Sequence, residues 1–393
     1  MTTETSGIKN TGLRGVTVAS TKISDVQGDA GKLIYRGYLV QALAENASFE
    51  EVAYLLLKEK LPTAKELAEF KAQLSSERFL PEAMITALRT IPANALPMDV
   101  LQAGISMLAA FDADTRNFSR DACVRMAVRL IAKVAVIVAA WHRIRNGKVP
   151  ITALNELGHG ANFMYMLTGE KPKPEVGRFM DKALVLHAEH SFNASTFAAR
   201  EVASTRAHIY AATSAAVGSL SGELHGSANV RVMEMLLKIG DSSRVEAYVK
   251  QELEAGRKLM GLGHAVYKTD DPRSFILAPM AQKMGELAGE TKWYDMAKRL
   301  EVAGKEAFRG KKGREIYVNV DFYSAPLYYA MGIPVDLFSS VFAVSRVAGW
   351  VSHVLEEQFA DAAPKAMLYR PESEYIGNYC GPAECEFIPQ AER

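Results

Sequence analysis

The densest group of chemically active side chains lies in residues 261–273, which read GLGHAVYKTDDPR. Glycines let a backbone approach a ligand closely, and His264 follows them directly. Lys268 and Arg273 can bind phosphate or carboxylate groups, and arginine can do so through two parallel hydrogen bonds. The alternative is a solvated turn that ends in Asp-Pro-Arg. Because His264 lies inside the glycine loop, we favour a functional site.

A second motif, HAEH, spans residues 187–190. Its spacing would place His187 and His190 on one face of a helix. The pair could bind a metal ion with Glu189, but the zinc-peptidase patterns are H-E-x-x-H and H-x-x-E-H, and this motif is neither. It could instead bind an anion near a helix end, or be two partly buried histidines satisfied by their neighbours. The spacing alone leaves all three interpretations open.

One histidine and one aspartate stand out singly. His225 lies in SGELHGSAN, ahead of the helical VRVMEMLLKIG, and the positive end of a helix lowers the pKa of a histidine. A neutral imidazole can donate to a carbonyl oxygen.

Asp321 lies in VNVDFYSAPL, where apolar neighbours raise the pKa of a carboxyl group and make it a better general base. The alternatives are a local cap or turn for His225, and for Asp321 the N-cap of a helix that begins near Ser324 or Pro326.

Two arginines occur in apolar or proline-punctuated segments. Arg346 lies in RVAGW and Arg370 in YRPESEY. Taken singly, each is most simply a surface arginine.

Composition limits the class of protein. The chain has 393 residues, 49% of them hydrophobic, which indicates two domains or one large domain with a smaller one attached. The net charge of +1 gives no reason to expect nucleic acid or a membrane as partner. Cys123, Cys380 and Cys385 are too few for a disulfide framework and favour a reducing compartment without a zinc site. No secretory signal or membrane span is apparent, so we expect a soluble cytoplasmic protein.

The elements that would position these residues are mostly helices. Residues 13–40 mix β-branched residues with glycines and predict a few short strands. Ser48 and Glu51 have a capping-box spacing, and apolar residues follow at helical period. Helical patterns continue through most of the chain without the β-α alternation of a parallel sheet. We therefore expect a mostly α fold, in which AATSAAVGSLSG forms a helix packed closely against its neighbours.

Together and in this order, the segments resemble the citrate synthase family. GLGHAVYKTDDPR is similar to that family's active-site signature, and the landmarks LHGSAN, VDFYS, HAEHSFNAST, RVAGW and the late Arg-Pro pair fall in the expected places. GLRGV, YRGY, SFEEVAYLLL and LPT match the N-terminal region, so the resemblance covers nearly the whole chain. It implies a two-domain, mostly α fold with a few short N-terminal strands. The large domain would comprise residues 1–225 and 333–393, the small domain residues 226–332, and the active site would lie in the cleft between them.

The resemblance also implies an acyltransferase reaction, in which oxaloacetate condenses with acetyl-CoA and citryl-CoA is then hydrolysed. Asp321 would remove a proton from the thioester methyl group, His225 would hydrogen-bond the thioester carbonyl, and His264 would polarise the ketone. The residues implied for oxaloacetate are His190, Arg273, Arg346 and Arg370, of which Arg370 would reach the neighbouring subunit's site in a homodimer. Those implied for coenzyme A are Gly261, Leu262, Gly263, Ala265, Val266 and Lys268.

The residue types suit this chemistry. Thioester carbon acids are weak, so proton removal needs a base opposite an oxyanion stabiliser. Closure of the small domain would exclude water, with oxaloacetate binding before acetyl-CoA. We expect no metal and no cofactor, since acetyl-CoA is a substrate, and this removes most of the weight from the metal interpretation of HAEH. The expected partners are the two substrates and a second copy of the chain, in a dimer or a larger homo-oligomer.

Two positions depart from the family pattern. Ala265 stands where many bacterial relatives have arginine, so one contact with coenzyme A is expected to be missing, and Leu262 stands where an aromatic residue is commoner. The short N-terminus predicts no NADH inhibition of the hexameric type.

Other functions fit some of the same residues. The motifs also fit 2-methylcitrate synthase, which uses propionyl-CoA, because one methyl group is worth only about 1–3 kcal/mol of discrimination. His187 favours citrate, since 2-methylcitrate synthases tend to have tyrosine there. A non-catalytic helical scaffold and a metalloenzyme are alternatives of other classes.

Overall fold

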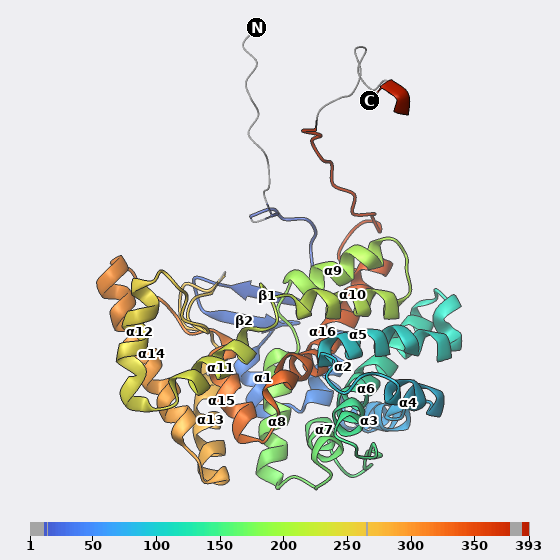
Figure 1. Cartoon of the computed structure of the whole chain (residues 1–393). Helices are drawn as coiled ribbons and strands as arrows, with labels where there is room; N and C mark the ends of the chain where they lie inside the picture. The colour runs from blue at the N-terminus through green and yellow to red at the C-terminus, as the bar shows by residue number, and fades with distance from the viewer. Residues whose placement is uncertain (1–11, 14, 265, 378–386, 393) are drawn as a thin grey trace.

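The computed structural model describes residues 12–13, 15–264, 266–377 and 387–392, and all statements on structure concern these residues. Helices make up almost the whole body, and one small sheet lies near the N-terminus (Figure 1). The predicted mostly α fold is confirmed. Cys123 is buried and free, whereas Cys380 and Cys385 lie outside the described residues.

The sheet has three short antiparallel strands in the order β1-β2-β3: β1 Ser24–Gln27, β2 Lys32–Tyr35 and β3 Tyr38–Leu39. Ser24 pairs with Tyr35, and Gln27 pairs with Lys32 at the turn. Leu33 and Tyr35 alternate inward and are fully buried, as expected for a sheet with one face on the core. These strands lie within the predicted range of residues 13–40.

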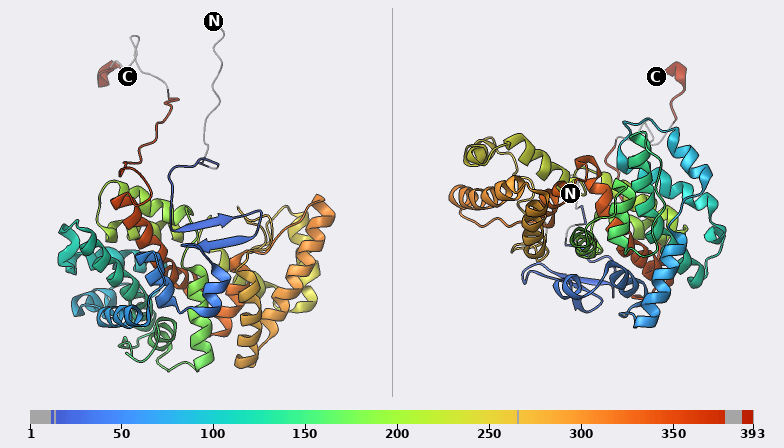
Figure 2. Two further views of the ribbon diagram at one scale, coloured as in Figure 1. Left: turned by 180° about the vertical axis from the view of Figure 1, so that it is seen from behind. Right: turned by 90° about the horizontal axis from the view of Figure 1, so that it is seen from below.

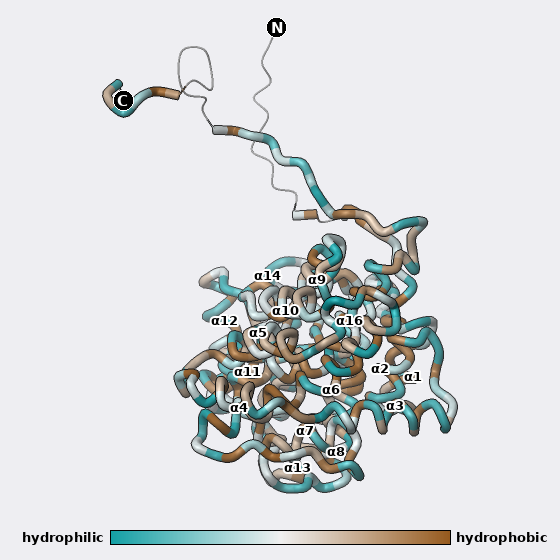
Figure 3. Tube along the Cα trace, turned by 90° about the vertical axis from the view of Figure 1, so that its right-hand side faces the viewer, coloured by the Kyte–Doolittle hydropathy of each residue, from teal (hydrophilic) through white to brown (hydrophobic). Residues whose placement is uncertain are grey.

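The largest group of helices surrounds α6 and α16 (Figures 1 and 2). By length and composition alone, Val335–Phe359 could cross a membrane, but its apolar window is 100% buried, as in the core helix of a soluble protein. Hydrophobic residues concentrate in this interior, and hydrophilic residues lie mainly on the outside (Figure 3). The helices of this group are α1 Val40–Asn46, α2 Phe49–Lys58, α3 Ala64–Glu77, α4 Glu82–Arg89, α5 Pro97–Leu108, α6 Arg120–Arg145, α7 His159–Thr168, α8 Pro174–His187, α9 Ala194–Ser204, α10 Ile209–Ser221 and α16 Phe338–Phe359.

Local sequence signals explain where several of these helices begin and how they pack. The Ser48 side chain accepts from the N–H of Glu51 and the Glu51 side chain accepts from the N–H of Ser48, which confirms the predicted capping box at α2. In α10, a Cβ on Gly218 would come within 2.6 Å of the Gln102 side chain on α5. The small residues of α10 therefore allow the close helix contact that the sequence predicted.

A second group, α11 to α15, lies together on one side of the body (Figure 2). Within it α13 and α11 pack against α15, and α12 packs against α14. The helices are α11 Ala228–Ile239, α12 Val245–Glu254, α13 Ser274–Ala288, α14 Lys292–Lys312 and α15 Val320–Ala330. The group falls inside residues 226–332, the predicted small domain, although the division into two domains stays a prediction.

Candidate active site

The glycine loop connects α12 to α13 and is bound along its backbone to the segment that leads into α15. Leu262 forms an antiparallel bridge with Val318. The N–H of Gly263 donates to the carbonyl of Tyr317 at 2.7 Å, and the N–H of Asn319 donates to the carbonyl of Gly261 at 3.0 Å. The Asn319 side chain also donates to the carbonyl of Gly263 at 3.1 Å. One short ladder therefore fixes the loop before His264 relative to the helix that carries Asp321.

Gly261 is required by this arrangement for two reasons. Its φ of +78° lies in the left-handed region, which side chains disfavour. A Cβ at this position would also come within 2.6 Å of the Phe322 ring and 2.8 Å of Val232. Backbone conformation and crowding both exclude a side chain here.

His264 is held in one tautomer by the loop that follows it. Its Nδ1 accepts hydrogen bonds from the backbone N–H of Val266 at 2.9 Å and of Tyr267 at 3.0 Å. Burial lowers the pKa of His264 to about 4. The negative charge of Asp271 raises this pKa and the positive charge of Arg273 lowers it further. The imidazole is therefore neutral near pH 7 and carries its proton on Nε2, which no hydrogen bond occupies within the described part of the chain.

His225 is held in the opposite tautomer by the first turn of α9. Its Nε2 accepts from the backbone N–H of Ser195 at 3.1 Å, so the proton lies on Nδ1. Burial, and then the charge of Arg346, lower the pKa of His225 to about 4. The pKa is lowered in the predicted direction, but burial and Arg346 cause the shift. The helix terminus that contacts the ring belongs to α9 and not to α11, which follows His225 in the chain.

Asp321 lies in the first turn of α15, two residues after the residue that caps the helix. Asn319 is the N-cap, and its side chain accepts from the N–H of Asp321 at 3.0 Å. Burial raises the pKa of Asp321 to about 6, with Arg273 and Arg346 opposing and Asp271 reinforcing the shift. The alternative that Asp321 is itself an N-cap is wrong. Among the described residues, no hydrogen bond reaches its carboxylate, so the group can accept a proton.

Arg273 is a fully buried cation with a buried partner. Its Nε and Nη2 donate to the two carboxylate oxygens of Asp271 at 2.9 and 2.6 Å. Arg273 and Asp271 are 2% and 0% exposed, which makes a correctly formed pair essential, because either charge alone would be costly to bury. The pair fixes the plane of the guanidinium and leaves Nη1 outside the pairing.

Arg346 is a second buried cation, so the interpretation of Arg346 as a surface arginine is wrong. It is 1% exposed, its Nε donates to the carbonyl of His187 at 2.6 Å, and its guanidinium lies 4.5 Å from the Phe342 ring centroid. Burial lowers its pKa to about 10, although Glu189 opposes the shift. The charge of Arg346 also lowers the pKa of His190 and of Asp321. Arg346 therefore lies within electrostatic reach of both groups.

The two histidines of HAEH have different environments. Helix α8 ends at His187, whose Nδ1 donates to the carbonyl of Ala183 at 2.7 Å while the ring packs edge-on against Phe342 at 5.1 Å. His190 follows in the turn, with its ring 5.7 Å from His264 and its Nε2 3.3 Å from the Tyr267 hydroxyl. The prediction that both lie on one helix face is wrong, because the helix stops between them. His190 alone joins the site.

The residues predicted for coenzyme A divide into three kinds. Gly261 and Leu262 are buried, and Leu262 packs beside Gly304 on α14. Val266 is 45% exposed, and Lys268 is exposed and pairs with Asp29 in the β1–β2 turn at 2.7 Å. Ala265 lies outside the described residues. Among the described residues of this set, Val266 and Lys268 are therefore the exposed ones.

Arg370 does not join the other site residues within this chain. It is exposed on the C-terminal segment that follows α16 and leaves the body (Figure 1).

Three residues of the site were not singled out from the sequence. Tyr267 contacts both His190 and His264, Asn319 fixes the glycine loop, and Ser195 fixes the tautomer of His225. Asn319 and Ser195 lie at helix N-termini, where Asn and Ser are common, so a capping signal beside a candidate residue could have indicated them.

Comparison with known proteins shows the family of this chain. The family model described as citrate synthase, C-terminal domain, matches residues 12–372. A citrate synthase of Haloferax volcanii is 42% identical, over 99% of this chain and 100% of the relative, and a 2-methylcitrate synthase of Shewanella oneidensis is 39% identical, over 93% and 94%. The structure of a Thermoplasma acidophilum citrate synthase, solved with carboxymethyl coenzyme A and oxaloacetate, matches with a TM-score of 0.89 and 32% identity, over 97% of this chain and 98% of that one. The chain belongs to the citrate synthase family.

Proposed function

We propose that the chain condenses oxaloacetate with acetyl-CoA and water to give citrate and CoA. The observation that carries this proposal is the combination of a carboxylate of raised pKa, Asp321, with two neutral histidines, His225 and His264, whose hydrogen bonds set opposite tautomers. This combination supplies a base and an N–H donor for the removal of a proton beside a thioester, and a second N–H donor for the ketone that the enol attacks.

The first step is enolisation of acetyl-CoA. Asp321 takes a proton from the methyl group, and its pKa of about 6 makes it both ionised and basic near neutral pH. The thioester oxygen gains negative charge as the proton leaves. The Nδ1–H of His225 donates to that oxygen, because Nε2 already accepts from Ser195.

The second step forms the carbon–carbon bond. The enol carbon attacks the ketone carbon of oxaloacetate, and the Nε2–H of His264 donates to the ketone oxygen and protonates it as the bond forms. The proton that Asp321 removed from the methyl group replaces the one that His264 gives up, so both residues end the step as they began it. His190, Arg273 and Arg346 hold the dianionic substrate with positive charge and hydrogen bonds. Water then hydrolyses citryl-CoA to citrate and CoA.

Arg370 and the exposed loop residues have proposed roles in a homodimer and in coenzyme A binding. In a homodimer Arg370 would bind oxaloacetate in the neighbouring subunit, which its exposed position favours. The exposed loop at Val266 and Lys268, together with Ala265, would contact coenzyme A without a separate cofactor. We place the reaction in the cytoplasm and in the tricarboxylic acid cycle.

The second candidate is the 2-methylcitrate synthase reaction with propionyl-CoA, which the Shewanella relative favours by its name. His187 supports the acetyl-CoA assignment. The deciding experiment is the ratio of kcat/KM for acetyl-CoA and propionyl-CoA with saturating oxaloacetate. We expect acetyl-CoA to be preferred by tenfold or more, and a preference for propionyl-CoA would overturn the assignment.

A further inference from the structure

A network of buried charged side chains and one histidine runs beside the site without touching the proposed reacting groups. Its members are at most 7% exposed and come from the turn before α9, from α9 and from α16: Glu189, Arg200, His353, Glu356 and Glu357. Burying this many charges is costly unless they are paired and oriented. Their contacts show which parts of the protein they orient.

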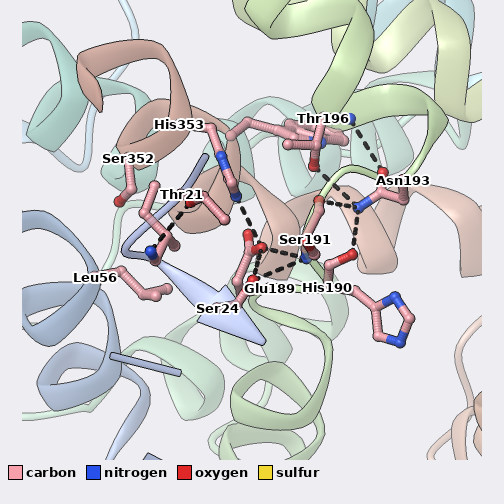
Figure 4. A network of polar contacts seen from close by, with 12 residues as sticks. Thr21, Ser24, Leu56, Glu189, His190, Ser191, Asn193, Thr196, Ser352 and His353 are labelled. Atoms are coloured by element: carbon pink, nitrogen blue, oxygen red, sulfur yellow. Dashed lines mark hydrogen bonds and ion pairs between the residues drawn. The ribbon is translucent and has the colours of Figure 1, made fainter. Parts of the chain in front are cut away.

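At one end, Glu189 fixes the turn that carries His190. Its Oε1 accepts from His353 Nε2 at 2.9 Å, from the Ser24 hydroxyl at 2.8 Å and from the N–H of Ser191 at 2.5 Å (Figure 4). Ser191 has a φ of +51°, a conformation that a residue with a side chain adopts only under constraint. The Glu189 carboxylate points into this network and the His190 ring points away from it (Figure 4). Glu189 thus holds the backbone from which His190 projects.

Arg200 lies at the centre of this network of side chains. Its Nη1 donates to His353 Nδ1 at 3.0 Å and to Glu356 at 2.7 Å. Its Nη2 pairs with Glu357 at 2.6 Å, and the guanidinium lies over the Phe192 ring at 4.5 Å. The Arg200 guanidinium therefore orients two side chains. One is His353, which in turn contacts Glu189, and the other is Glu357.

At the other end, Glu357 anchors the C-terminal segment. It accepts from the Tyr369 hydroxyl at 2.7 Å, and the N–H of Tyr369 donates to the Ser204 hydroxyl at 3.2 Å. The Tyr369 ring also lies 5.7 Å from the Phe197 ring. These contacts fix the segment at the residue immediately before Arg370.

We propose that Arg200 is a positioning residue for oxaloacetate binding, which acts through Glu189 on His190 and through Tyr369 on Arg370. The proposal rests on the proposed function, which gives His190 and Arg370 their roles. The Glu189 arm acts on the oxaloacetate site of its own subunit, and the Tyr369 arm acts, through Arg370, on that of the neighbouring subunit. Each arm can therefore be removed while the other remains.

The test is a pair of double-mutant cycles with oxaloacetate binding as the readout, measured by calorimetry without acetyl-CoA. Tyr369→Phe removes one hydroxyl, and Glu189→Gln removes one charge at nearly constant volume. We expect each to weaken oxaloacetate binding by about fivefold to tenfold, the equivalent of one typical hydrogen bond. In steady-state assays the KM for oxaloacetate should rise while the KM for acetyl-CoA stays within twofold. Tyr38→Phe, at an exposed tyrosine on β3, is the matched control and should change neither.

The cycles separate positioning from general stability. In an Arg370→Ala background, Tyr369→Phe should have no further effect on oxaloacetate binding, whereas Glu189→Gln should keep its effect. In a His190→Ala background, Glu189→Gln should have no further effect on oxaloacetate binding, whereas Tyr369→Phe should keep its effect. Full effects of Tyr369→Phe in the Arg370→Ala background, or no effect in the unaltered protein, would overturn the proposal.

A failure of this proposal differs from a failure of the proposed function. If the unaltered protein binds oxaloacetate and releases CoA but the variants bind normally, only the positioning role is wrong. If the unaltered protein neither binds oxaloacetate nor releases CoA, both are wrong.

Discussion

The backbone N–H of Ser195 donates to Nε2 of His225 over 3.1 Å, so the first turn of α9 determines which ring nitrogen of His225 carries the proton. Asn193 is the N-cap of that turn, and its side chain accepts from the Ser195 hydroxyl at 2.7 Å and from the N–H of Thr196 at 3.0 Å. A backbone donor cannot change its role with pH. The tautomer of His225 is therefore a property of the fold.

The first prediction concerns this tautomer. Nitrogen-15 NMR of the labelled protein should show His225 as a neutral ring protonated on Nδ1 throughout about pH 6 to 8, because burial holds its pKa at about 4. His264 should be neutral over the same range but protonated on Nε2. His225→Gln and His264→Gln assign the two signals. Equal tautomers at the two rings would contradict the proposed division of roles.

The second prediction concerns stability and pH at Asp321. Its folded-state pKa of about 6 lies above the ordinary aspartate value of 3.8, so the folded state loses stability relative to the unfolded state as pH rises through this range. Asp321→Asn cannot ionise and should be more stable than the unaltered protein by about 1–3 kcal/mol at pH 8. The gain should shrink by about pH 5, as urea unfolding at the two pH values would show. A gain that is absent, or larger at the lower pH, would count against the raised pKa.

The third prediction uses two glycines with similar backbones and different surroundings. Gly261 and Gly256 have φ values of +78° and +71°, but a Cβ would meet Phe322 and Val232 at Gly261 and nothing within 4 Å at Gly256. Gly256→Ala should cost about 1–2 kcal/mol for its backbone alone. Gly261→Ala should cost about 1–3 kcal/mol more because of crowding, and should also lower kcat by displacing the glycine loop. Equal losses of unfolding free energy in the two variants would show that crowding at Gly261 is unimportant.

Local signals in the sequence predicted much of the fold. The capping box at Ser48 and Glu51, the short N-terminal strands and the mostly α architecture all follow from neighbouring residues and are confirmed. The HAEH motif was misread because periodicity alone does not show where a helix ends. Helix α8 stops at His187, and the chain passes through the left-handed Ser191 before α9 begins.

The electrostatics of the site depends on contacts between distant segments. Arg346 is buried because α16 crosses the core, and its partner is the carbonyl of His187, 159 residues earlier in the chain. The α9 turn that sets the tautomer of His225 lies 30 residues before it. No local pattern contains such pairs, so the resemblance to a known family was needed to gather these residues into one site.

The most direct test of the proposed chemistry is CoA release from acetyl-CoA and oxaloacetate by the unaltered protein and by Asp321→Asn. We predict that the unaltered protein releases CoA only when both substrates are present, with kcat/KM falling below about pH 6 as Asp321 is protonated. The variant should lose about 10²- to 10⁴-fold in kcat, the usual contribution of a general base, while it still binds oxaloacetate. An Asp321→Asn variant that released CoA within twofold of the unaltered rate would contradict the assignment of Asp321 as the base.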